Sequence, residues 1–188
     1  MRTALVIAAL VALGLAWGPD WEARLGPFPA HMLRHMLLVV VAAPLIALAL
    51  PKLRAWAPPV MLAAVLEFAV VWGFHLPAWH APAQAGGFAL VLEQALFLAA
   101  GLAVWASALP PAQPLAGAGG LLLTSMHMTL LGALLVLAPS DLYAEVCGRA
   151  PDLGGQQLGG ILMLAFGTPV YLLAGLALTA SALKEQVA

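Results

Sequence analysis

Histidines and methionines gather at the beginning of one apolar stretch, residues 31–50. His31 and His35 are four residues apart, so on a helix their rings lie on one face and could hold one metal ion between them. Met32 and Met36 repeat this spacing one position further round the helix. Imidazole and thioether together form a ligand set that soft Cu(I) prefers over harder cations. The spacing therefore predicts a Cu(I) site at the mouth of this helix.

Other ionisable side chains interrupt apolar segments further along the chain. His75 and His80 flank a proline-containing connection, Glu67 and Glu93 lie within apolar runs, and His127 lies halfway along another. An ionisable group inside a membrane is costly and usually faces the bundle interior with a partner. The candidate metal ligands are therefore His31, His35, His75, His80, His127, Glu93, Met32 and Met36. The alternative, in which the histidines only contact lipid headgroups or loop carbonyls, stays open.

The composition is that of an integral membrane protein. The chain is 64% hydrophobic and only 8% charged, whereas an average soluble domain is about a quarter charged. We therefore expect an all-α, polytopic helical bundle that forms a single domain over residues 1–188, with the lipid bilayer as its surroundings. The net charge is −1 and no segment is a block of basic residues, which argues against a nucleic-acid partner. The one cysteine, Cys147, cannot form an intrachain disulfide.

About six segments are predicted to cross the bilayer as helices. At about 1.5 Å rise per residue, twenty residues span the roughly 30 Å hydrocarbon layer. The predicted spans are residues 3–17, 31–50, 57–75, 88–109, 115–138 and 156–183. The first is short, so it could be either a retained helix or a signal segment that is cleaved. Cleavage would leave five spans. Gly159 and Gly160, in the last span, predict a surface where helices pack closely.

The basic residues predict how the bundle is oriented. In a six-span model one side carries Arg2, Lys52, Arg54 and Lys184. Because positive charge favours the cytoplasmic side, we expect both termini in the cytoplasm of a bacterial inner membrane. The four histidines from His31 to His80 and the polar loop 141–152 then lie at the outer, periplasmic face. His127 alone is expected near the middle of the membrane.

Several short motifs resemble a known family. They are His31-Met-x-x-His35-Met-Leu-Leu, His75-Leu-Pro, Met126-His127, Leu142-Tyr143 and Gln156-Gln157-Leu158-Gly159-Gly160. Over about residues 28–180 they resemble the CtaG family of polytopic cytochrome c oxidase assembly factors, which is linked to caa-type oxidases. The family pattern often has Glu-His where this chain has Glu93-Gln94. The motifs add Tyr143, Gln156 and Gln157 to the site candidates, and the polar loop adds Asp141.

The resemblance implies a function without catalysis. It implies a helper in the maturation of a copper-containing oxidase, which handles copper at the outer face. The implied partners are oxidase subunits and a periplasmic copper chaperone.

Other classes of function remain open from the residues alone. Histidines on different helices could ligate haem in an electron-transfer protein. Glu67, Glu93 and His127 could line the path of a metal or proton transporter. A scaffold for oxidase subunits would need no metal.

Overall fold

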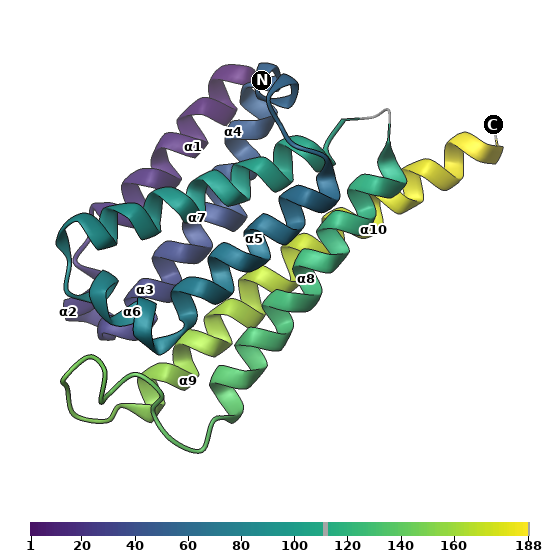
Figure 1. Ribbon diagram of the computed structural model, residues 1–188. Helices are drawn as coiled ribbons and strands as arrows, with labels where there is room; N and C mark the ends of the chain where they lie inside the picture. The colour runs from purple at the N-terminus through teal and green to yellow at the C-terminus, as the bar shows by residue number, and fades with distance from the viewer. Residues whose placement is uncertain (111–112, 188) are drawn as a thin grey trace.

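The computed structural model describes residues 1–110 and 113–187, and within these ranges every regular element is helical (Figure 1). The expectation of an all-α bundle is thus confirmed. The elements are α1 (Arg2–Trp17), α2 (Trp21–Leu25), α3 (Pro27–Met36), the π-helical turn η1 (Leu37–Ala42), α4 (Ala43–Ala49), the short 3₁₀ helix η2 (Pro51–Ala55), α5 (Val60–His75), α6 (Pro77–Gln84), α7 (Gly87–Ala108), α8 (Pro114–Leu137), α9 (Leu153–Leu162), the π-helical turn η3 (Met163–Gly167) and α10 (Thr168–Val187).

Four continuous helices among the described residues are long and apolar enough to cross a membrane. They are Pro27–Ala49, Gly87–Ala108, Pro114–Leu137 and Leu153–Lys184. α5 and α6 together would form a fifth span, bent by 73° between them. The shorter α1 has 16 residues and packs against the first of these spans. Counting α1, the elements correspond to the six segments expected from the sequence.

Two segments that were expected to be connections form helices instead. The segment between the predicted spans 3–17 and 31–50 was expected to connect them, but Pro27 begins α3 there, because the first helical position needs no N–H donor. His31 and His35 therefore lie inside α3 rather than at its mouth. After His75 the chain continues into α6, which Pro77 begins in the same way.

The start of α1 and the end of α10 lie at one end of the bundle, and the segments that carry the four histidines from His31 to His80 lie at the other (Figure 1). We call the second end the histidine end. It contains the start of α3, the bend between α5 and α6, and the start of α9. The loop between α8 and α9, residues 138–152, also lies there (Figure 1).

The π-helical turn η1 exposes one carbonyl inside the bundle. The Ala43 N–H donates to the carbonyl five residues earlier, and the next residue, Pro44, has no N–H. The Val39 carbonyl is thereby left without a donor from its own helix. Nε1 of Trp105 donates to it at 2.9 Å, and the Tyr171 hydroxyl lies 3.3 Å from it. The turn therefore ties this span to α7 and α10.

Glycines let α9 fit between two neighbouring helices. A Cβ atom on Gly159 would lie 2.6 Å from the ring of Phe28 in α3. A Cβ atom on Gly160 would lie 2.8 Å from the carbonyl of Gly132 in α8. Neither position has room for a side chain. The prediction of close helix packing at this glycine pair is confirmed.

Candidate metal centre

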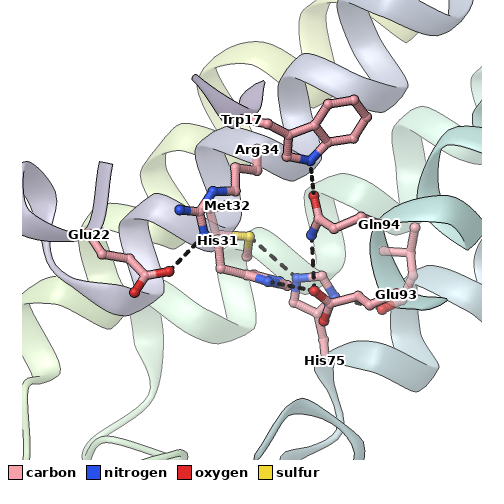
Figure 2. Close-up of polar contacts among 9 residues, drawn as sticks. Trp17, Glu22, His31, Met32, Arg34, His75, Glu93 and Gln94 are labelled. Atoms are coloured by element: carbon pink, nitrogen blue, oxygen red, sulfur yellow. Dashed lines mark hydrogen bonds and ion pairs between the residues drawn. The ribbon is translucent and has the colours of Figure 1, made fainter. Parts of the chain in front are cut away.

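Three potential metal ligands from three helices meet at the histidine end. His31 of α3, His80 of α6 and Glu93 of α7 each offer one ligand atom, and these atoms lie within 4.8 Å of one another. Nδ1 of His31 is 3.3 Å from Oε2 of Glu93 (Figure 2). All three side chains are at most 1% exposed. We call them the carboxylate triad.

The bend between α5 and α6 brings His80 to this place. Leu76 has an extended backbone, which the following proline favours, so the chain turns sharply after α5. The ring of His80 then lies 4.7 Å from that of His31, measured between centroids. His75, at the end of α5, lies 5.2 Å from His31 on the same measure. The bend therefore gathers residues that a straight helix would separate.

Several ring nitrogens in this region have no hydrogen-bond partner. Apart from the 3.3 Å contact between Nδ1 of His31 and Glu93, the ring nitrogens of His31 and His35 are buried without a hydrogen-bond partner among the described residues, as is Nδ1 of His80. Buried polar groups in folded proteins are nearly always paired, because an unpaired group loses its hydration without compensation. Lone pairs that converge beside a carboxylate are the donor set that Cu or Zn ions take. The residues of the triad thus fit a metal ion.

His75 and Met32 meet beside the triad. Nδ1 of His75 is 2.6 Å from the carbonyl of Val71, and its Nε2 is 3.3 Å from Sδ of Met32 (Figure 2). His35 stacks on the ring of Phe97, with centroids 4.1 Å apart, and lies 5.3 Å from the ring of His75. Five candidate ligands from the sequence, together with Met32, are thus gathered at one end of the bundle.

The structure places two other candidate ligands elsewhere. Sδ of Met36 lies against Gly167 of η3, where an added Cβ would be 3.3 Å from it. His127 lies beside Glu67, with 4.0 Å between its Nε2 and Oε2 of that carboxyl group. Neither residue belongs to the group of ligand atoms that converge at the carboxylate triad.

Two residues that the sequence did not suggest hold Glu93 in place. Nε2 of Gln94 donates to Oε2 of Glu93 at 3.0 Å, and Nε1 of Trp17 lies 3.4 Å from Oε1 of Gln94 (Figure 2). Such contacts behind a ligand fix its orientation. Their only signal in the sequence is a polar residue beside Glu93 in an apolar run. Where the family pattern has histidine, Gln94 thus supports the carboxylate.

The loop 138–152 is organised by one carboxylate. Oδ1 of Asp141 accepts from the N–H groups of Tyr143 and Ala144, and Oδ2 accepts from the N–H of Asp152 and pairs with Arg149 at 2.8 Å. Burial by itself raises the pKa of Asp141, but the N–H groups and the Arg149 charge lower it below its ordinary value. Asp141 is therefore a structural centre of the loop.

Tyr143 closes this loop over the histidines. Its hydroxyl donates to the carbonyl of His75 at 2.9 Å, which caps the end of α5. Its ring lies 4.6 Å from those of Phe28 and His80. The ring is buried, so it forms part of the wall around His80.

The two adjacent glutamines fasten α9 to the end of α8. Nε2 of Gln156 donates to the carbonyl of Leu135, and Nε2 of Gln157 donates to that of Val136. These carbonyls belong to the last turn of α8, which has no further N–H donors of its own. Oε1 of Gln156 also accepts from the N–H of Leu142 at 2.8 Å. Both glutamines thus position the loop rather than contact the triad.

A surface cavity leads to the triad. It has a volume of about 170 Å³ and reaches His80. Its lining residues are Glu22, Pro27, Phe28, His80, Gln84, Cys147 and Arg149. A small solute could approach His80 through this cavity without crossing the helices.

Glu67 lies in a separate polar network deeper in the bundle. Thr124 donates to Oε2 of Glu67 at 2.9 Å, and the Tyr171 hydroxyl is 2.6 Å from Oε1. The carboxyl group is fully buried. The expectation that an ionisable group in an apolar run faces the bundle interior with a partner is met here by hydrogen bonds.

The family of the chain follows from a comparison over almost its whole length. The family model described as cytochrome c oxidase caa3 assembly factor matches residues 1–185. The chain belongs to this family. The resemblance of the histidine and glutamine motifs is thereby confirmed, and the assembly role that defines the family is not a catalytic one. A search of curated proteins found no match to the chain, and a search of solved structures found none either.

Proposed function

We propose that this caa3 assembly factor binds copper at the carboxylate triad and passes it to the oxidase. The observation that carries the proposal is the convergence of His31, His80 and Glu93, whose ligand atoms lie within 4.8 Å beside unpartnered ring nitrogens. Glu93 supplies the negative charge that a buried metal cation needs in a medium of low dielectric constant. The family match to caa3 cytochrome c oxidase assembly factors supports an oxidase as the recipient.

Exchange of ligands is the mechanism that these residues support. Neutral imidazoles hold Cu(I) without forcing a change of oxidation state, and each can be replaced in turn by a ligand of the partner. The cavity at His80 gives such a partner its approach. The proposed partners are oxidase subunits and a copper chaperone. The histidine end then faces the periplasm, and both termini lie in the cytoplasm at the inner membrane.

The test is the metal content of detergent-purified protein after incubation with Cu(I) under reducing conditions. We expect the wild-type protein to retain copper and the His31→Ala/His80→Ala variant to lose most of the copper at the triad. His127→Ala is the matched control, because it removes a buried histidine that has no contact with the triad, and it should retain the wild-type amount. Equal copper in the double variant and the wild type would refute the site.

Further measurements on the same protein identify the alternative functions. Wild-type protein without copper that still co-purifies with oxidase subunits would be a metal-free scaffold. A Soret band would identify a haem protein. Copper flux into proteoliposomes, carried along Glu67 and His127, would identify a transporter.

A further inference from the structure

The proton of His75 is located by its surroundings. Nδ1 lies 2.6 Å from the Val71 carbonyl, which can only accept, so Nδ1 carries the proton. A charged ring would be a buried cation with no carboxylate in contact, because Glu93 contacts His31 instead. The ring is therefore neutral, and Nε2 has a free lone pair.

The lone pair on Nε2 of His75 faces a lone pair on the thioether sulfur of Met32. Sδ of Met32 lies 3.3 Å from Nε2 of His75, and a thioether has no proton to donate. Both side chains are buried, so water does not separate them. Ligand bonds of about 2.0 Å to nitrogen and about 2.3 Å to sulfur, at a tetrahedral angle, place two ligands of one metal about 3.5 Å apart. The observed separation is close to that value.

His35 supplies a third ligand on the same side. Both of its ring nitrogens are buried and unpartnered, and its ring lies 5.3 Å from that of His75 but 6.4 Å from that of His31. The stack on Phe97 holds the ring in this position. His35 therefore lies nearer to His75 than to its partner in the sequence motif.

We propose that Met32, His75 and His35 form a second metal position, selective for Cu(I), beside the carboxylate triad. The proposal rests on the proposed function, because copper is the cargo in both. The three ligands are neutral, so a buried divalent ion would lack charge compensation there. The thioether further favours Cu(I) over Zn(II) and Cu(II). The triad, with its carboxylate, suits Zn(II) as well.

The two positions differ in their access to the surface. His80 of the triad lines the surface cavity, whereas none of the three second-position residues does. Copper that enters at the triad can therefore pass to the thioether position and be kept there as Cu(I). The rings of His31 and His75, with centroids 5.2 Å apart, form the boundary between the positions.

X-ray absorption at the copper edge tests the second position on the full chain in detergent. Cys147→Ser serves as the background, because it removes the only cysteine. With Cu(I) this protein should show sulfur scattering at about 2.3 Å and about two copper ions per chain. Adding Met32→Leu should abolish the sulfur scattering and leave about one copper, bound by nitrogen and oxygen. Leucine closely matches methionine in volume, so the fold should be kept.

Met36→Leu is the matched control, since Met36 lies in the same span but against Gly167. It should retain both the sulfur scattering and the second copper. Zn(II) should bind at about one ion per chain in every variant. Sulfur scattering that persists in Met32→Leu, or copper bound only by nitrogen and oxygen in the background protein, would overturn the second position alone. Background protein without any copper would overturn the proposed function as well.

Discussion

The Tyr171 hydroxyl has a single proton and two acceptors within reach. Oε1 of Glu67 is 2.6 Å away, and the Val39 carbonyl is 3.3 Å away. If Glu67 is protonated, it donates to Tyr171, which then donates to Val39, and both contacts are satisfied. A neutral carboxyl group also avoids a buried charge. We therefore expect Glu67 to be protonated in the folded protein.

Two substitutions at Glu67 separate a neutral carboxyl group from an ionised one. Glutamine can donate from its amide to Tyr171 and accept from Thr124, so Glu67→Gln should change the free energy of unfolding by less than about 1 kcal/mol. Leucine removes both contacts, so Glu67→Leu should cost about 1–3 kcal/mol for each group left unpaired. Denaturation in detergent measures both values. A Gln variant as unstable as the Leu variant would show that Glu67 is ionised.

The spacing of His31 and His35 predicted their shared helix face but not their different neighbours. Both side chains point into the bundle, yet His31 meets Glu93 whereas His35 stacks on Phe97. Those neighbours come from α7, and no pattern within residues 31–50 specifies how α7 is positioned. The candidate ligands could thus be predicted from residue type. Which of them lie together could not, because that depends on packing between distant segments.

At the scale of elements, the sequence predicted where helices run better than how they are interrupted. Residues 31–50 were expected as one helix, and the structure has a π-helical turn in its middle. A π-helical turn does not change the hydrophobic pattern of the sequence, because its side chains are as apolar as those of the helix around it. Pro44 was the only residue that indicated an interruption here. The bend before α6 did have a signal, since a residue that precedes proline favours an extended backbone.

The turn η1 makes a testable link between Pro44 and Trp105. Trp105→Phe removes the indole donor to the Val39 carbonyl, which keeps only the longer contact with Tyr171, and should cost about 0.5–1.5 kcal/mol of stability. Pro44→Ala restores a backbone N–H that can serve the carbonyls of this turn. In the Pro44→Ala background, Trp105→Phe should therefore cost less, by about 1 kcal/mol.

Unfolding of the two single variants and the double variant, compared with the wild type, gives this coupling energy directly. If the stability losses of the two single variants add up to that of the double variant, the alanine N–H does not replace the indole donor.

At the scale of the whole molecule, Cys147 reports which side of the membrane the histidine end faces. The thiol lines the cavity beside His80, and it is the only one in the chain. If that end is periplasmic, a membrane-impermeant maleimide should label Cys147 in spheroplasts before permeabilisation. Burial raises the pKa of this thiol, so labelling should be slow near neutral pH and accelerate as the pH rises.

A variant with the cysteine moved to the other end provides the control for this labelling. Cys147→Ser combined with Lys184→Cys places the thiol at an exposed position near the end of α10. This variant should react only after permeabilisation. The reverse pattern in the two proteins would invert the orientation.

The polar network around Glu67 also constrains the order in which the chain can mature. Tyr171 follows Glu67 by 104 residues, so α5 leaves the ribosome long before the hydrogen-bond partner of Glu67 exists. Thr124 arrives earlier, with α8, and can serve one carboxyl oxygen in the meantime. The other oxygen has no partner until α10 is made. The interior of the bundle is therefore complete only once α10 has been made, and a chain that stops before α10 leaves one oxygen of Glu67 without its hydrogen-bond partner.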